Sequence, residues 1–387
     1  MELKEYQQGV LRKVDHYLAV LAAQVEKVEK ARYLIAEQGI DLDIGDPCRK
    51  AWDQLNKERV LPYLKDRDGR TVIAPWLARH DGLQRSIPNI CLKVPTGGGK
   101  TLLAVCSLER LQTDFLKRQT GFVLWVVPSD AIYRQTWKQL ANREHPYRQI
   151  LERASGGRVK LLEKGDAFAL RDAEGRLCVM LLMLPSAARQ SKETLRMFRD
   201  SGRFPSFFPP EDDSKANQHL LDAVRNLDIN DLAEMGWQEG IVPGSLSIKQ
   251  SLGNVLRLVR PVVVVDEGHK AYSDTAKDTL CGFNPRFILE LSATPNTNGR
   301  HQSNVLVNVT GRDLKDEEMI KLPINVVNED KGGWKQTLAA AHGKLEELAK
   351  ETSLFQNESG RYIRPILLVR VERTGKENVR LTIVAGH

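Results

Sequence analysis

Residues 94–101 read Val-Pro-Thr-Gly-Gly-Gly-Lys-Thr, and this stretch decides the fold class. It follows the apolar run 90–94, which resembles a buried strand, and precedes a helical pattern that reaches Leu108. Glycine accepts the backbone angles that let neighbouring N–H groups face one anion, and the start of a helix attracts negative charge. A strand, a glycine-rich turn and a helix in this order predict a phosphate-binding loop rather than a chance glycine turn.

The loop is expected to bind ATP together with Mg²⁺. Its backbone N–H groups would surround the phosphates, Lys100 would place a positive charge at the β- and γ-phosphates, and the Thr101 hydroxyl would bind the metal ion. The strict form of this motif has glycine at position 94, where this chain has valine. The residues expected to bind the nucleotide here are Thr96, Gly97, Gly98, Gly99, Lys100 and Thr101.

A second motif follows the four valines 262–265 and reads Asp266-Glu267-Gly268-His269. A strand would place Asp266 at its C-terminal end, where a carboxylate suits Mg²⁺, mainly through water. Glu267 is expected to orient and deprotonate the attacking water. A kinase needs no such base beside its metal ligand, so the second acid favours hydrolysis. His269 is expected to relay the nucleotide state to the next motif, with a structural histidine as the alternative.

A third motif, Ser292-Ala293-Thr294, follows the apolar run 287–291. Hydroxyl groups at a strand end can hydrogen-bond the acidic motif and sense the γ-phosphate. Alone, this segment is also an ordinary exit from a strand into a turn.

The spacing of apolar runs predicts an α/β fold. Nearly continuous apolar strands separated by helical stretches indicate a mostly parallel sheet with helices on both faces. The expected strands are 90–94, 122–127, 177–184, 262–265 and 287–291.

We divide the chain into three regions. Residues 1–86 form an N-terminal helical region, with apolar spacing from Leu11 to Val28 and a stop at Gly39, and residues 41–86 receive no firm assignment. Residues 87–325 form the ATPase lobe, interrupted by an insertion at about 190–255 with a helix near 212–226. Residues 326–387 hold a linker helix at 334–352 and a strand at 363–371.

Together the three motifs resemble superfamily 2 helicases and translocases of the DEAD/DEAH type. The closer resemblance is to the ATPase part of type III restriction enzymes, the Res subunit, over residues 87–135, 255–300 and 363–371. The resemblance implies a RecA-like lobe. It also implies that Gln7 contacts adenine and that Tyr6 packs beside it, although a polar first helical turn is the alternative.

The resemblance further implies contacts with DNA. Pro128, Ser129 and Gln135 fall on the segment that touches the nucleic-acid backbone, and Ser186 falls on a looser second contact. Ser292 and Thr294 fall on the motif that couples hydrolysis to strand movement.

The chain departs from the family pattern in two places. Lys100 and Asp266 are 166 positions apart, more than a compact lobe needs, which marks the insertion as extra. Only residues 361–369 resemble the first strand of a second helicase lobe, so that lobe, with its arginine fingers, is expected to be truncated. No nuclease motif is apparent.

A basic stripe begins inside the insertion. Positive side chains step by three or four positions, which would align them on one helix face and let them follow DNA phosphates. A solvated helix face is the alternative. The stripe consists of Arg189, Lys192, Arg196, Arg199 and Arg203, and Arg196 and Arg199 are the preferred DNA contacts.

Composition excludes several other classes. The chain has 387 residues, of which 41% are hydrophobic and 28% charged, with a net charge of +7. This is a globular composition, and it excludes collagen-like and wholly disordered proteins. Five scattered cysteines without zinc spacing favour a reducing cytoplasm. No secretory signal is visible, and no apolar run approaches the roughly 18 residues of a membrane span.

These observations predict an ATP-dependent DNA helicase or translocase lobe. It would hydrolyse ATP on double-stranded DNA within a type III restriction or phage-defence system, with a methyltransferase subunit as a partner. The alternatives are a truncated nucleotide- or DNA-binding module with little turnover, and an RNA helicase. A small-molecule kinase is disfavoured by the second and third motifs.

Overall fold

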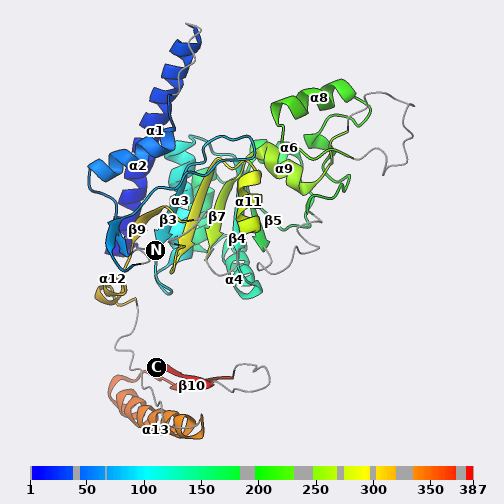
Figure 1. The fold of residues 1–387 in the computed structure, drawn as a ribbon. Helices are drawn as coiled ribbons and strands as arrows, with labels where there is room; N and C mark the ends of the chain where they lie inside the picture. Colours follow the sequence, from blue (N-terminus) through cyan, green and yellow to red (C-terminus); the bar gives the residue numbers. More distant parts are fainter. Residues whose placement is uncertain are drawn as a thin grey trace. The chain divides into compact units, whose positions relative to one another are not determined.

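The computed structural model describes residues 2–37, 44–65, 68–183, 197–230, 247–267, 274–296, 302–319, 334–371 and 381–386 (Figure 1). The chain divides into two compact units, Met1–Lys321 and Leu322–His387. The sequence placed the last boundary at 325/326, inside the stretch 320–333 that lies outside the described residues.

The first unit is built on a seven-stranded sheet in which every neighbouring pair is parallel. Its order is β5 (Val159–Leu162), β6 (Leu177–Met183), β4 (Gly121–Val127), β7 (Val262–Asp266), β8 (Phe287–Ser292), β3 (Asn89–Lys93) and β9 (Val305–Asn308). The five inner strands are the five expected from the sequence. The two edge strands, β5 and β9, were not predicted because four residues are too few for a periodic signal.

Alternate residues of the inner strands belong to two separate cores, one on each face of the sheet. On β7, Val262 and Val264 pack into the first core, whereas Val263 and Val265 pack into the second. Coverage of both faces explains why these strands are continuously apolar. The predicted α/β class, a RecA-like parallel sheet between helices, is confirmed.

Helices α1 (Glu5–Glu37), α2 (Pro47–Lys57), α3 (Lys100–Arg110), α4 (Asp130–Ala141), α5 (Pro146–Ser155) and α12 (Gly311–Asp316) contribute to the first core. Helices α6 (Leu170–Gly175), α9 (Leu252–Val259) and α11 (Asp274–Gly282) contribute to the second. A π-helical turn, η1 (Leu111–Phe115), continues α3.

The N-terminal region shares the first core with the sheet. Tyr17 of α1 is fully buried and packs edge-on against Trp52 of α2 and Phe287 of β8, at centroid distances of 6.4 and 6.3 Å. The region also contains a short antiparallel pair, β1 (Tyr63–Lys65) and β2 (Thr71–Ile73). Helix α2 and this pair occupy the stretch that received no assignment from the sequence.

The described part of the insertion covers the second face. Phe204 and Phe207, around the 3₁₀ turn η2 (Pro205–Phe207), pack against Phe168 at 5.3 and 5.5 Å. The helix expected near 212–226 is present as α8 (Ser214–Ala223). The basic stripe, however, does not continue along one helix: Arg199 and Arg203 lie in non-helical backbone after Met197, so their predicted helical alignment is wrong.

The second unit contains α13 (Trp334–Ser359) and an antiparallel pair of strands, β10 (Ile366–Val371) and β11 (Leu381–Gly386). The helix and the first strand correspond to those expected at 334–352 and 363–371, and β11 was not predicted. Among the described helices of the whole chain, none combines the length and apolar character that crossing a bilayer requires.

Candidate active site

The predicted catalytic segments meet at one edge of the sheet. Strand β8 lies between β7 and β3, so the C-terminal ends of all three strands are neighbours. Two backbone hydrogen bonds join the segments that follow them. Val94 N–H donates to the Ser292 carbonyl at 3.0 Å, and Glu267 N–H donates to the Leu291 carbonyl at 2.8 Å. The glycine loop and both later motifs are therefore fixed to one another by the sheet.

The glycines of the loop are required by backbone conformation and by space. Gly97 and Gly99 have φ of +85° and +72°, in the left-handed region that side chains disfavour. At Gly98, a Cβ atom would lie 2.6 Å from Val94 Cγ1. At Gly99, it would lie 2.7 Å from Gln7 Nε2. A side chain at any of these positions would strain the backbone or force Val94 or Gln7 to shift.

Lys100 and Glu267 form an ion pair across the site. Lys100 Nζ lies 2.8 Å from Glu267 Oε1, and both side chains are largely buried. The same ammonium group donates to the carbonyls of Val94 and Pro95, each at 3.3 Å. The positive group at the start of α3 and the negative group after β7 are thus in direct contact, although they lie far apart in sequence.

Asp266 is the last residue of β7 and is only 5% exposed. Burial, reinforced by the negative charge of Glu267, raises its pKa to about 6, while Lys100 opposes the shift. Its Oδ1 atom is buried and has no hydrogen-bond partner. A buried carboxylate with a free oxygen suits a hard cation.

These residues fit the requirements of Mg²⁺. The ion prefers oxygen donors and keeps several waters, so one carboxylate and one hydroxyl can suffice beside substrate phosphates. Asp266 offers the carboxylate, and Thr101 in the first turn of α3 offers the hydroxyl. Within the described ranges no group of three or more His, Cys, Asp or Glu side chains could form an all-protein metal site.

Glu267 has an unusual backbone for a residue with a long side chain. Its φ is +51°, which is sparsely populated and costs about 1 kcal/mol or more. Its carboxylate also accepts a 3.4 Å hydrogen bond from Ala293 N–H. The backbone angle and this contact aim the carboxylate at Lys100 and at the third motif.

The third motif lies beside the acidic pair. Ser292 is 3% exposed, and its Oγ accepts a hydrogen bond from Thr294 N–H at 3.2 Å, while Thr294 itself is exposed. Ala293 N–H donates to Glu267, so a movement of the Glu267 carboxylate would lengthen or break this hydrogen bond to the third motif.

Gln7 is placed against the glycine loop. It is 2% exposed, its Oε1 accepts from Lys4 N–H at 3.0 Å, and its Nε2 donates to the Tyr6 hydroxyl at 3.2 Å. Tyr6 in turn donates to the Gly98 carbonyl at 2.9 Å. The start of α1 is thereby tied to the loop, a contact that no spacing in the sequence indicated.

The residues expected to contact DNA are more dispersed. Pro128 and Ser129 are half-buried at the C-terminal end of β4, beside β7, and Ser129 Oγ accepts from Ile132 N–H at the start of α4. Gln135 is exposed on α4, and Arg199 is exposed in a bend of the insertion. His269, Ser186 and Arg196 lie outside the described residues.

A RecA-like parallel sheet, with a glycine loop after β3 and an Asp-Glu pair at the end of β7 on the other side of β8, defines the class of helicase-type P-loop ATPase lobes. The family model described as type III restriction enzyme, res subunit, matches residues 1–297, and the chain belongs to this family. The family links the chain to ATP-dependent, helicase-like activity in restriction enzymes. A search of curated proteins found no match.

Proposed function

We propose that the chain hydrolyses ATP as the motor lobe of a DNA translocase in a type III restriction or phage-defence enzyme. The observation that carries this proposal is the 2.8 Å pair between Lys100 and Glu267, with Asp266 buried beside it. Phosphate-binding and water-activating groups are then close enough to act on one triphosphate.

In this proposal the loop N–H groups and Lys100 bind the phosphates of ATP. Phosphate oxygens compete with Glu267 for the Lys100 ammonium group, because both are anions and the ammonium is shared. Glu267, once released, accepts a proton from the water that attacks the γ-phosphorus, and ADP leaves. Mg²⁺, held by Asp266 and Thr101, would neutralise charge on the phosphates.

Coupling to DNA would begin at the third motif. The contact from Ala293 N–H to Glu267 links the state of the nucleotide to Ser292 and Thr294. Pro128 and Ser129, which follow β4 beside β7, are proposed DNA contacts together with Gln135 and Arg199. A methyltransferase subunit is the proposed partner. Because both subunits would act on DNA, we place the protein in the cytoplasm.

The test is ATP hydrolysis with and without duplex DNA. Glu267→Gln should retain ATP binding and lose hydrolysis by roughly 10²-fold or more, because the amide cannot accept the proton. Glu144→Gln, a change at an exposed glutamate outside the site, should behave as the wild type. Normal hydrolysis by Glu267→Gln would refute the assignment.

The same assay distinguishes the remaining alternatives. Stimulation by duplex DNA supports translocation on DNA, whereas stimulation by RNA alone would identify an RNA-dependent motor. Tight ATP binding with negligible turnover, even on DNA, would instead identify a binding module, since arginines from a partner lobe can contribute about 10³–10⁵ to the rate in related systems.

A further inference from the structure

A cavity of about 510 Å³ lies at the opposite end of the sheet from the phosphate loop. It is lined by Gly121 at the start of β4, by Val262 at the start of β7, and by Arg286, which precedes β8. The acidic motif lies at the other end of β7, roughly 13 Å away at about 3.3 Å per residue. The cavity is therefore separate from the proposed ATP site.

Three arginines from different segments line this cavity. Arg118 follows η1, Arg260 follows α9, and Arg286 precedes β8. None forms an ion pair with any acid in the described part of the chain. The lining includes one acid, the exposed Glu174. The cavity thus carries excess positive charge.

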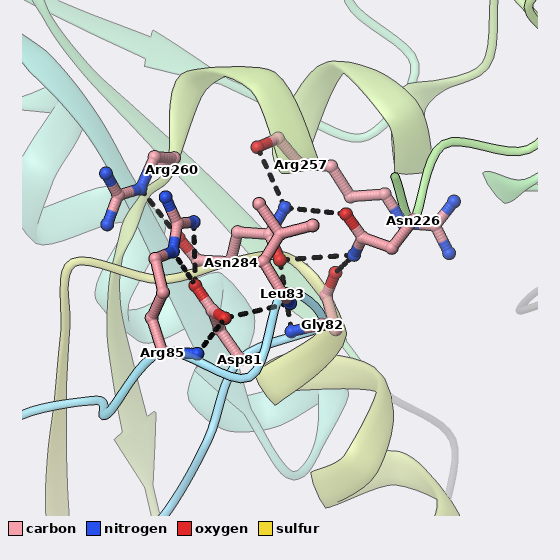
Figure 2. Close-up of polar contacts among 9 residues, drawn as sticks. Asp81, Gly82, Leu83, Arg85, Asn226, Arg257, Arg260 and Asn284 are labelled. Carbon is pink, nitrogen blue, oxygen red and sulfur yellow. Dashed lines mark hydrogen bonds and ion pairs between the residues drawn. The ribbon is translucent and has the colours of Figure 1, made fainter. Parts of the chain in front are cut away.

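Arg260 is held in position by a half-buried polar network centred on Asn284 (Figure 2). Its Nε donates to the Asn284 carbonyl at 3.4 Å. Asn284 is fully buried, and its side chain accepts from Gly82 N–H and Asn226 Nδ2, each at 3.1 Å. Its Nδ2 donates to the Asn226 side chain at 2.9 Å and to the Arg257 carbonyl at 3.3 Å. The segments of Gly82 and Asn226 therefore hold Asn284, whose carbonyl contacts Arg260.

The arginines experience one another's charge. Burial, together with the positive charges of Arg85 and Arg286, lowers the pKa of Arg260 to about 10, which leaves it charged at neutral pH. Burial, together with the charges of Arg118 and Arg85, also lowers the pKa of Arg286. Figure 2 shows that Arg85, unlike Arg260, is bound to Asp81. The charge of Asp81 opposes the shift at Arg260. Because Asp81 is already paired with Arg85, positive charge remains in excess at the cavity, which favours binding of an anion.

A second observation comes from Gln112, which lines the same cavity. Its side chain is 2% exposed, and its Oε1 atom is buried without a hydrogen-bond partner. A buried acceptor without a donor is costly, and a rotation of the Gln112 amide toward the cavity would let a ligand hydroxyl or amino group satisfy it. Apolar side chains such as Leu116 and Leu258 complete the walls.

We propose that this cavity binds a small organic phosphate, with its phosphate on Arg118, Arg260 and Arg286 and its hydroxyl or amino group on Gln112. The N–H groups of a guanidinium can form two parallel hydrogen bonds to phosphate oxygens. The cavity volume also falls within the range of roughly 300–1,000 Å³ that is typical of small-molecule sites. The proposal does not depend on the ATPase function.

The test uses uridine 5′-monophosphate, which carries a phosphate and hydroxyl groups, in calorimetric titrations. The background is Lys100→Ala, which removes the main charge of the phosphate loop. We expect one saturable site that Arg260→Gln and Arg286→Gln each weaken by roughly tenfold or more, the size of a lost charge-assisted hydrogen bond. Arg143→Gln, an equal charge change at an exposed residue outside the cavity, should have no effect.

Two further measurements keep the result decisive. Arg118 is exposed, so Arg118→Gln tests the site even if a change at Arg260 disturbs folding. A duplex DNA oligonucleotide is titrated against the same variants. Absence of saturable nucleotide binding, or binding that none of the arginine variants weakens, would overturn the proposal. Loss of duplex affinity in these variants without nucleotide binding would assign the arginines to DNA phosphates and overturn it equally.

Discussion

At the scale of single residues, the site shows which properties follow from sequence and which do not. The types and order of Lys100, Asp266 and Glu267 predicted a shared site, because parallel strands bring their C-terminal ends together. The hydrogen bond from Tyr6 to Gly98, and the left-handed backbone of Glu267, could not be predicted. Both depend on tertiary packing that leaves no periodic signal in the chain.

Asp266 should make stability depend on pH. Its pKa of about 6 in the folded protein lies above its ordinary value of 3.8. The folded state therefore binds the proton more tightly, and stability falls as pH rises through this interval. The shift corresponds to a destabilisation of up to about 3 kcal/mol above pH 6.

Asp266→Asn should remove this effect while keeping the shape of the side chain. Urea unfolding at pH 8 should show a variant more stable than the wild type, and the difference should disappear below about pH 3, where Asp266 is protonated in both the folded and the unfolded state. The exposed Asp212→Asn is the control. Equal stability of Asp266→Asn and wild type at pH 8 would contradict the prediction.

Gly99 should be intolerant of even a methyl group. Alanine there must adopt φ near +72° and approach Gln7 Nε2 to 2.7 Å, so the loop or the start of α1 must shift. We expect Gly99→Ala to weaken ATP binding by roughly tenfold or more, equivalent to about 1.4 kcal/mol. Gly165→Ala, where a Cβ meets nothing within 4 Å, should bind normally. Equilibrium binding of a fluorescent ATP analogue measures both.

At the scale of elements, the strength of the hydrophobic signal decided what could be predicted. The inner strands are buried on both faces and are therefore continuously apolar, so all five were predicted. In edge strand β5, three of the four residues are only half-buried, and the hydrophobic pattern of so short a segment does not distinguish a strand from a loop. The predicted helical alignment of the basic stripe is wrong for a related reason. The spacing of charges alone does not specify a helix, and the backbone is not helical after Met197.

Where α1 packs onto the sheet, the energetic gain from a buried aromatic ring can be compared with the cost of its unpaired hydroxyl group. Tyr17 is fully buried between Trp52 and Phe287, yet its hydroxyl has no hydrogen-bond partner. Tyr17→Phe keeps the ring and removes the unsatisfied group, so it should stabilise the protein by about 1 kcal/mol. Tyr17→Ala should destabilise it by about 3–5 kcal/mol through loss of the ring. Thermal unfolding of both variants measures these changes, and destabilisation by Tyr17→Phe would show that the hydroxyl is bonded in solution.

At the scale of the whole molecule, the two compact units differ in how they obtain stability. Both cores of the first unit draw their described buried residues from positions up to Leu314. In the second unit, the described helix α13 has one buried residue, Leu348, which belongs to neither core. Folding of the ATPase lobe should therefore depend little on residues 322–387.

A chain shortened to residues 1–321 should accordingly fold and bind ATP as the full chain does. Its main thermal transition should lie within roughly 2–4 °C of that of the full chain, a shift that corresponds to about 1 kcal/mol for a domain of this size class. ATP affinity should be unchanged, because the loop, the acidic motif and Gln7 all lie within the first unit. A chain 1–296, which lacks edge strand β9 and helix α12, is the contrasting variant. It should lose the cooperative transition, since Val305, Leu306 and Val307 of β9 and Leu314 of α12 are part of the first core. Unfolding of 1–321, or cooperative folding of 1–296, would show that the core boundaries differ from those in the structure.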